Sequence, residues 1–270
     1  MPKSQRTVVN LGLTEALLPA YIAKQGGGEA AAWLGWDCYR RLLLSYAMHV
    51  LRLDREPFDL IRSDALDAAK ADGEHELGAA ALEALTRSLA AEVEKAGALP
   101  RAPFEWLERA VAGGFAAWNL PEADEHRRHT MLEGLPGTAL IVQAMVQGTA
   151  SDGAHGGAGH LHSRLPATGE KKLHGSYLAQ AQGEDLTAGV RLPDSLDVLA
   201  KRLPDAHREV CEWAEKLERQ LRNAIELDFT IQRGTLYLLN ALPASRTHRA
   251  SLKMKLVPRA VVPCKNLSEP

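Results

Sequence analysis

The chain has 270 residues, of which 46% are hydrophobic and 24% are charged, the composition of a globular protein with one large domain or two small ones. The formal net charge of -2 gives no electrostatic basis for binding nucleic acid or an acidic membrane surface. No apolar run approaches the roughly 18 to 20 residues of a membrane span, and no signal-like apolar core follows the N-terminus, so we expect a cytoplasmic protein without a membrane partner.

The first 130 residues favour helices. A short helix near Thr14 is expected to be limited by Pro19, and residues 26–28, all glycine, form a clear break. After this break, aromatic and leucine side chains recur at three- and four-residue spacing from Trp33 to Met48, which predicts a helix. Further helices are predicted over residues 57–72, over residues 77–96 and from Pro103 onward.

The pattern changes near Gly137. The apolar run 140–146 predicts a largely buried strand, and the glycine-rich stretch 148–159 predicts a loop. Short strands are expected over residues 158–163 and 173–178, followed by a helical patch at 196–199, a restart at Pro204 and a helix over 207–223.

A β-hairpin is predicted around Gly234, with strands over residues 225–232 and 235–240. Because side chains alternate along a strand, Glu226 and Asp228 share one face of it and the apolar residues between them point to the other.

The length of the hairpin loop decides where Asn240 lies. A three-residue loop places it opposite Glu226 on the same face, whereas a two-residue loop places it opposite Leu227, facing away. We favour the three-residue loop because Gly234 suits the left-handed position that this loop requires.

Cysteines and histidines give no standard site pattern. The three cysteines, Cys38, Cys211 and Cys264, are far apart and form no CxxC motif, so we interpret them as reduced packing residues. Three histidines fall close together, and imidazole is a common ligand for zinc, copper and nickel. Yet no cysteine or further close histidine completes a tetrahedral set, so we interpret them as surface-loop residues: His155, His160 and His162.

Several short motifs carry a family resemblance. Pro166-Ala167-Thr168-Gly169-Glu170-Lys171-Lys172-Leu173 and Ala181-Gln182-Gly183-Glu184-Asp185 follow an apolar run and a glycine-rich loop. This order resembles the nucleotide-binding domain of pyruvate phosphate dikinase, an ATP-grasp domain. Trp36-Asp37-Cys38-Tyr39-Arg40-Arg41 is similar to the start of that domain's helical insertion, and the resemblance covers most of residues 7–250.

The resemblance implies roles for individual residues. The family's hinge strand, whose backbone meets the adenine ring, corresponds to Gln143, Ala144, Met145 and Val146. The arginine of the family's Thr-Arg-Asn-Pro turn and the two acids beside the nucleotide correspond to Arg164, Glu184 and Asp185, which are the catalytic candidates. The family's magnesium site corresponds to Glu226, Asp228 and Asn240. The implied cofactors are ATP and Mg²⁺, since carboxylates and phosphate oxygens hold this ion.

The chain departs from the family at the same site. Its carboxylates come in the order Glu226 then Asp228, where the family has Asp then Glu, and Asn240 stands for a glutamine. Leu242 replaces an arginine that contacts phosphate. The family's first lobe, its phosphohistidine domain and its pyruvate barrel have no counterpart in this sequence. The resemblance therefore implies at most weakened ATP and Mg²⁺ binding, and leaves open a functional site or a relic of one.

We expect an α+β fold. Residues 1–130 are a mostly helical part resembling the helical insertion, residues 131–250 an ATP-grasp-like lobe with an antiparallel sheet and packed helices, and residues 251–270 a tail. The expected function is that of a dikinase-like ATP-binding protein, a phosphotransferase of the kinase type if active, or a pseudoenzyme. The alternatives are a non-catalytic interaction or regulatory protein and one half of a split phosphotransferase. A protein partner or a second copy would then dock on the face left by the missing lobe.

Overall fold

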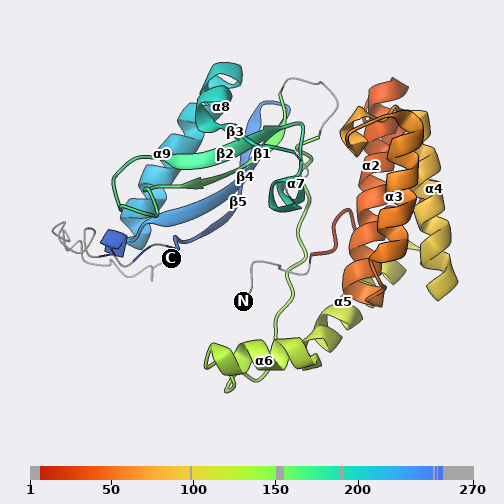
Figure 1. The fold of residues 1–270 in the computed structure, drawn as a ribbon, viewed down its shortest axis with the longest axis horizontal. Helices are drawn as coiled ribbons and strands as arrows, with labels where there is room; N and C mark the ends of the chain where they lie inside the picture. The colour runs from red at the N-terminus through yellow and green to blue at the C-terminus, as the bar shows by residue number, and fades with distance from the viewer. Residues whose placement is uncertain are drawn as a thin grey trace, which may run out of the picture. The chain divides into compact units, whose positions relative to one another are not determined.

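The computed structural model of the protein describes residues 7–97, 99–149, 155–188, 191–245, 247 and 249–251. It contains two compact units, Met1–Met145 and Val146–Pro270. The first unit is helical and the second combines an antiparallel sheet with helices, which confirms the expected α+β class (Figure 1). Within the described ranges, every helix is too short or too polar to cross a membrane.

The first unit confirms the helices that the apolar periodicity predicts. The short helix expected after Thr14 is a single turn, Glu15–Leu17, that ends before Pro19. Pro19 itself lies in the first turn of the next helix, where its missing N–H leaves no helical hydrogen bond unmade. Gly97 directly follows the helix predicted over residues 77–96, as expected for a residue that ends a helix. The helices are α1 (Leu18–Lys24), α2 (Gly28–Tyr46), α3 (Glu56–Ala69), α4 (Ala79–Ala96), α5 (Pro103–Ala116) and α6 (Pro121–His129). A single turn at Glu15–Leu17 precedes α1, and further short turns lie between later helices at Ala47–Leu51, Glu74–Glu76 and Ala117–Asn119.

Helix α2 lies at the centre of this unit and packs mainly against α4. Its aromatic and leucine side chains are buried, together with the leucine stripe of α4. The Tyr46 ring meets the fully buried Trp106 ring edge-on, with centroids 4.7 Å apart. The aromatic stripe of the sequence is therefore core, as its spacing indicates.

A network of arginines and carboxylates is buried in the same core. Asp37 is 1% exposed and accepts hydrogen bonds from Arg40 at 2.7 Å and from Arg41 at 2.7 Å. Glu74 accepts hydrogen bonds from Arg40 at 3.2 Å and from Arg62 at 2.7 Å. We refer to these five residues as the arginine–carboxylate network. It joins α2 to α3 and to the turn before α4.

The second unit is built on a five-stranded antiparallel sheet of order β3-β2-β1-β4-β5. The strands are β1 (Gly157–His162), β2 (His174–Ala179), β3 (Asp194–Ser195), β4 (Ile225–Gln232) and β5 (Thr235–Pro243). The short strands expected after the glycine-rich stretch and the hairpin at Gly234 are confirmed.

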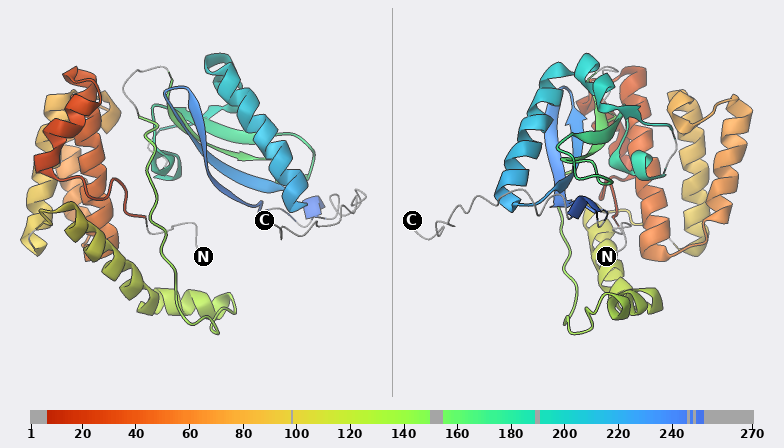
Figure 2. Two further views of the ribbon diagram at one scale, coloured as in Figure 1. Left: turned by 180° about the vertical axis from the view of Figure 1, so that it is seen from behind. Right: turned by 60° about the vertical axis from the view of Figure 1, so that its left-hand side comes forward.

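Helices α8 (Leu196–Arg202) and α9 (Pro204–Leu221) cover one face of this sheet (Figure 2). Leu161 of β1 and the odd-numbered apolar residues of β4 meet Leu199 and Val210 there, all with less than 2% exposure. Gly159 leaves room for the Phe229 ring, because a Cβ at this glycine would lie 2.0 Å from that ring. A shorter helix, α7 (Gly183–Ala188), contacts β1 and β4.

One expectation for the middle of the chain is wrong, and another is wrong at one end only. Residues 140–146 form no strand: they are extended, without sheet partners, and mostly exposed. A strand needs a hydrogen-bonded neighbour, and this apolar run lies where one compact unit passes into the other. The predicted loop 148–159 ends earlier than expected: residues 148–149 form a turn and residues 155–156 lie outside any strand, but β1 begins at Gly157, where Gly157 and Gly159 pack closely against neighbouring strands. Residues 150–154 of this prediction lie outside the described residues.

Candidate functional site

Strands β1 and β4 bring four polar side chains together. Their antiparallel register pairs His160 with Asp228 and His162 with Glu226. Because strand side chains alternate, all four lie on one face, and the leucines between them are fully buried against α8 and α9 on the other. We refer to these four residues as the histidine–carboxylate cluster.

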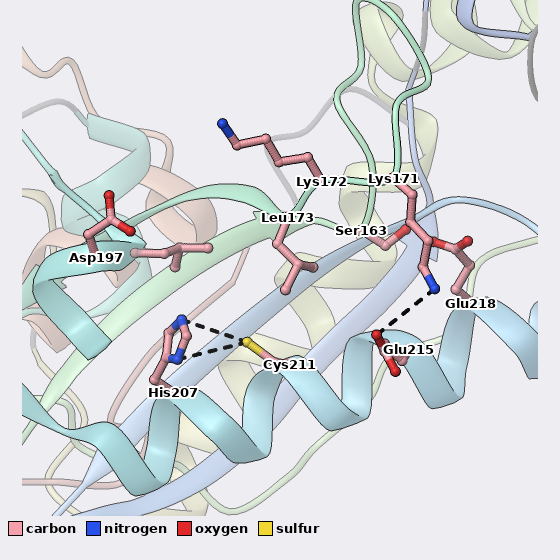
Figure 3. A pocket seen from close by; sticks show the side chains of 10 residues that line it. Ser163, Lys171, Lys172, Leu173, Asp197, His207, Cys211, Glu215 and Glu218 are labelled. Carbon is pink, nitrogen blue, oxygen red and sulfur yellow. Dashed lines mark hydrogen bonds and ion pairs between the residues drawn. The ribbon is translucent and has the colours of Figure 1, made fainter. Parts of the chain in front are cut away.

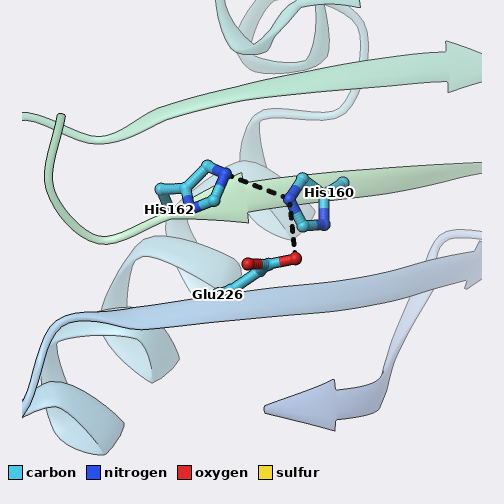
Figure 4. Close-up of side chains that lie close together, drawn as sticks. All are labelled: His160, His162 and Glu226. Carbon is cyan, nitrogen blue, oxygen red and sulfur yellow. Dashed lines mark hydrogen bonds and ion pairs between the residues drawn. The ribbon is translucent and has the colours of Figure 1, made fainter. Parts of the chain in front are cut away.

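His160 lies at the centre of the cluster. Its Nδ1 is 2.6 Å from Asp228 Oδ1, and its Nε2 is 3.6 Å from Glu226 Oε1 and 3.2 Å from His162 Nε2. Figure 4 shows the imidazole of His160 joined by contacts to His162 on the same strand and to Glu226 on the neighbouring one. One ligand atom each from His160, His162 and Glu226 lie within 4.8 Å of one another.

The cluster is half-buried. The His160 side chain is 27% exposed and that of Asp228 is 46% exposed, whereas Glu226 is only 11% exposed. The site is thus shielded from bulk water on the Glu226 side and accessible at Asp228. Such an environment lets a ligand reach the cluster while strengthening charge interactions inside it.

The prediction that His160 and His162 are surface-loop residues is wrong. They are strand residues two positions apart, and the neighbouring strand supplies the further ligands that their own sequence surroundings lack. The sequence does hold a signal for this: a His-x-His pair in one predicted strand and a Glu-x-Asp pair in another each put both side chains on one face. His155 precedes β1 and its backbone carbonyl accepts a hydrogen bond from Gly234.

Asn240 joins the cluster by a route that differs from the expected one. The hairpin loop has two residues, since Gln232 pairs directly with Thr235. A regular two-residue hairpin would turn Asn240 away, but a bulge between Asp228 and Phe229 shifts the register by one residue. Asn240 therefore lies opposite Asp228, not Glu226, and its Nδ2 is 3.5 Å from Asp228 Oδ2.

A depression of about 410 Å³ runs along α9 on the other side of the sheet (Figure 3). Within it Cys211 Sγ lies 3.7 Å from His207 Nε2, and Lys171 Nζ lies 3.9 Å from Glu215. Burial, with the nearby carboxylates of Glu215 and Glu212, raises the pKa of the Cys211 thiol. A raised pKa removes thiolate, so this Cys–His pair is not an activated nucleophile.

Cys38 is also unsuited to chemistry. Burial, followed by the charge of Asp37, raises the pKa of its thiol to about 12. Its side chain packs inside the helical unit at 1% exposure, in agreement with a packing role. Cys264 lies outside the described residues.

Comparison with known proteins identifies the relatives of the chain. No protein-family model matches it. Curated proteins do match over 94% of its length: pyruvate, phosphate dikinase of Clostridium symbiosum is 34% identical over 261 residues, and the chloroplastic dikinase of Flaveria trinervia 35% over 263. This chain is homologous to part of pyruvate, phosphate dikinase. It spans 29% of the Clostridium protein and 26% of the Flaveria protein.

Pyruvate, phosphate dikinase 1 of Arabidopsis thaliana gives the same result, with 33% identity over 257 residues, 94% of this chain and 26% of the plant protein. The shared segment thus includes both the helical unit and the sheet unit. The resemblance expected from the short motifs is confirmed along almost the whole chain.

Arg164, a candidate from the dikinase resemblance, is engaged in an ion pair. It lies two residues after the end of β1, and its guanidinium donates from Nε at 2.8 Å and from Nη2 at 2.5 Å to Glu218 Oε1. Both side chains are less than 20% exposed. In this structure Arg164 ties the end of β1 to α9.

The two acids predicted beside the nucleotide lie in the first turn of α7. Asp185 Oδ2 accepts a hydrogen bond of 2.8 Å from the backbone N–H of Gln182, while Glu184 is exposed. Gln182 is itself buried and bonded to Gln147 and Thr149. Asp185 therefore helps to fix the start of α7.

The predicted hinge residues are placed in the extended run between the units. Gln143, Ala144 and Met145 are exposed and Val146 is half-buried. The next residue, Gln147, already contacts the sheet: its backbone N–H donates a hydrogen bond of 3.1 Å to the side chain of Gln232 in β4. The structure thus brings Glu226, Asp228 and Asn240 together, and holds Arg164 and Asp185 through local contacts of their own.

The donor types show which ions the cluster suits. Two carboxylates and an amide on one face fit Mg²⁺, which prefers oxygen ligands. The two imidazoles beside them are not ligands that Mg²⁺ favours, and suit zinc, nickel, copper or iron instead. The cluster therefore contains the expected oxygen donors together with a second, softer donor set.

Proposed function

We propose that the chain is a nucleotide-binding module of the dikinase type, which binds ATP with Mg²⁺ on the face of the sheet that carries Glu226, Asp228 and Asn240. The observation that carries this proposal is the gathering of these three oxygen donors by the bulged hairpin. The match to the dikinases over 94% of the chain supports it.

In this proposal each candidate residue has a role. Glu226 and Asp228 would hold Mg²⁺ together with phosphate oxygens, and Asn240 would orient Asp228 or add a ligand. The backbone of residues 143–146 would contact the adenine ring, and the phosphates would approach the first turn of α7. Arg164 would have to leave its ion pair with Glu218 of α9 to contact a phosphate. Mg²⁺ supplies charge neutralisation for any phosphoryl transfer.

We place the role at binding rather than turnover. Leu242 lies opposite Glu226, at the position where the dikinase resemblance implies a phosphate-contacting arginine. Losing one charge-assisted contact costs ~1.5 to 3 kcal/mol, so we expect weak affinity and a pseudoenzyme. A phosphotransferase activity would need further cations from elsewhere.

Calorimetric titration with ATP tests this proposal. Saturable heat that requires Mg²⁺ is expected, and the double variant Glu226→Ala with Asp228→Ala should abolish it because both ion ligands are lost. The matched control removes the same charge from exposed positions of α9, Glu209→Ala with Glu212→Ala, and should bind as the parent does. Unchanged Mg²⁺-dependent heat in the Glu226–Asp228 variant would contradict the assignment.

A second candidate role is self-association through strand β5. It is the last strand of the sheet and carries no charged side chain between Thr235 and Leu242. Tyr237, Leu239 and Leu242 are 41%, 43% and 47% exposed. Native proteins usually protect a long edge strand with charges, so an uncharged edge favours antiparallel pairing with the same strand of a second copy.

Light scattering of the purified chain tests this role. Pairing predicts a dimer at micromolar concentration that Leu239→Lys converts into a monomer, because the lysine charge would be desolvated at the new edge. Leu221→Lys, which changes a 50% exposed leucine of α9, is the control and should remain dimeric. A monodisperse monomer of the parent chain would remove this candidate.

A further inference from the structure

We propose that His160, His162 and Glu226 form a binding site for a divalent transition metal of the zinc type. This site differs from the proposed Mg²⁺–ATP site in its ligands, since two of its three donors are imidazole nitrogens. The two sites share Glu226. The inference does not depend on nucleotide binding. It rests on the positions of three ligand atoms that two neighbouring strands hold within 4.8 Å.

The distances fit coordination of one ion. For metal–ligand bonds of about 2.05 Å, the 3.2 Å between the two Nε2 atoms subtends about 103° at the ion. The 3.6 Å from His160 Nε2 to Glu226 Oε1 subtends about 123° on the same assumption. Both angles lie near the tetrahedral value of about 109° that zinc adopts, so the two distances from His160 Nε2 are compatible with coordination of one ion.

Asp228 completes the arrangement from behind His160. Its Oδ1 lies 2.6 Å from His160 Nδ1, so an ionised carboxylate here accepts the Nδ1 hydrogen and leaves the Nε2 lone pair directed at the metal position. Asn240 is placed 3.5 Å from the other oxygen of the same carboxylate. Carboxylate–histidine–metal pairs of this kind fix the tautomer and raise the basicity of the ligand.

The strand framework restricts the ligand positions. His160 and His162 are two residues apart on β1, which is hydrogen-bonded to β2 on one side and to β4 on the other. The backbone of Glu226 is therefore fixed against that of His162 by the sheet ladder. Ligands on paired central strands lose little conformational freedom when they bind an ion.

The donor set selects the ion class. Two imidazoles and one carboxylate suit zinc, cobalt, nickel or iron, whereas Mg²⁺ takes oxygen ligands and keeps its waters. Three protein ligands leave a fourth position of a tetrahedral ion for water or for an anionic oxygen of a ligand. The half-exposed Asp228 side of the cluster provides the access that such an exchangeable position needs.

Metal titration without nucleotide tests the proposal. The full chain, freed of metal by a chelator, is titrated with Co²⁺ and then with Zn²⁺ and followed by visible absorption and calorimetry. We expect one Co²⁺ per chain with the intense absorption of a tetrahedral ion, displacement by Zn²⁺, and no displacement by Mg²⁺. Binding with an octahedral spectrum, or displacement by Mg²⁺, would overturn the assignment.

Variants separate ligands from the positioning residue. His160→Ala, His162→Ala and Glu226→Gln should each weaken Co²⁺ binding by at least about 100-fold, and Asp228→Asn by about 10- to 100-fold. Glu226→Gln retains the size and polarity of the side chain, so it keeps the test valid if a histidine variant fails to fold. Unchanged Co²⁺ affinity in Glu226→Gln together with either folded histidine variant would overturn the proposal.

His207→Ala is the matched control. This histidine lies beside Cys211 on α9, where an imidazole meets a thiol outside the histidine–carboxylate cluster. It should leave stoichiometry and spectrum unchanged. Loss of the Co²⁺ signal in this variant would assign the ion to the α9 depression and overturn the site on β1 and β4. Because no nucleotide is present, none of these outcomes depends on whether ATP binds.

Discussion

The two units each contain a cluster of charged side chains, and the clusters differ in how their charges are balanced. In the helical unit, the carboxylates of Asp37 and Glu74 are matched by three guanidinium groups, and every pair lies within 3.2 Å. In the sheet unit, the carboxylates of Glu226 and Asp228 meet the imidazole of His160. The first cluster is closed by its own partners, and the second has donor atoms suited to an added cation.

This difference separates a structural role from a binding role. A buried carboxylate surrounded by arginines has its charge neutralised, and burial cannot then drive its protonation. Accordingly, burial raises the pKa of Asp37, but the charges of Arg41 and Arg40 outweigh it and hold this pKa below its usual value. The histidine–carboxylate cluster is half-buried, and its carboxylates contact the imidazole of His160 instead of guanidinium groups, so its donor atoms include a set that could hold a metal ion.

The largest expected effect comes from breaking the closed network. Asp37→Asn should destabilise the helical unit by ~3 to 5 kcal/mol, because two nearly buried guanidinium groups lose their charged acceptor. Urea unfolding followed by tryptophan fluorescence measures this, since Trp33, Trp36, Trp106 and Trp118 all lie in this unit.

The control for Asp37→Asn is an exposed pair on α3. Asp59 pairs with Arg55, and their side chains are 54% and 76% exposed. Asp59→Asn should change stability by less than ~0.5 kcal/mol, because solvent screens such a pair. Equal changes in the free energy of unfolding for the two variants would show that the buried network stabilises the unit no more than an exposed ion pair does.

A smaller effect is expected from pH through Glu74. Burial raises its pKa, but the hydrogen bond from Arg62 and the charge of Arg40 lower it overall to about 2, against an ordinary value of 4.5. Since the folded-state pKa lies below the unfolded one, the stabilisation is complete above pH 4.5 and is lost as the pH falls toward 2. The loss should be about 2 to 3 kcal/mol, and urea midpoints at about pH 5 and about pH 3 measure most of it.

Glu74→Gln provides the comparison for this pH dependence. The variant has no charge to lose, so its stability should fall less between the same two pH values than that of the parent. An identical acid dependence in parent and variant would show that other carboxylates are responsible. Asp37, whose pKa is also lowered, is the next one to test.

Among the residues of the two clusters, the smallest effect on stability is expected for Glu226. Glu226→Gln should change the free energy of unfolding by less than ~1 kcal/mol, because a neutral amide can replace the carboxylate beside His160 and relieves repulsion from Asp228. Thermal unfolding in the presence of a chelator measures this. A loss as large as that of Asp37→Asn would place Glu226 among the structural residues and end the contrast between the clusters.

The helical unit was largely predictable from the sequence, because its helices follow local rules. The signals that predict these helices lie within one or two helical turns of each other in the sequence. They are leucines at three- and four-residue spacing, the glycine before α2 and the glycine after α4. The family resemblance was equally accessible, since it lies in consecutive residues such as 166–173. Both kinds of information are short-range.

The site was less predictable because it is made between strands. His160 and His162 have no ligand pattern along the chain, and only the register of β1 against β4 brings Glu226 and Asp228 to them. The same is true of Asn240. It lies opposite Asp228 because of a β-bulge, and no residue in the sequence around the bulge predicts it. The run 140–146 misled for a related reason: apolar residues favour a strand only where a neighbouring strand pairs with them.

The sequence by itself therefore determined the α+β class, the positions of the main helices and the relationship to pyruvate, phosphate dikinase. It also determined that Glu226 and Asp228 share a face, since strand alternation requires this. Tertiary structure decided which residues stand beside those acids. Cross-strand neighbours depend on the register of the strands. That register is set by the packing of Leu161 and Leu227 against α8 and α9 and by one bulge. Packing and bulge both involve segments far apart in the sequence, so no single stretch of chain encodes them.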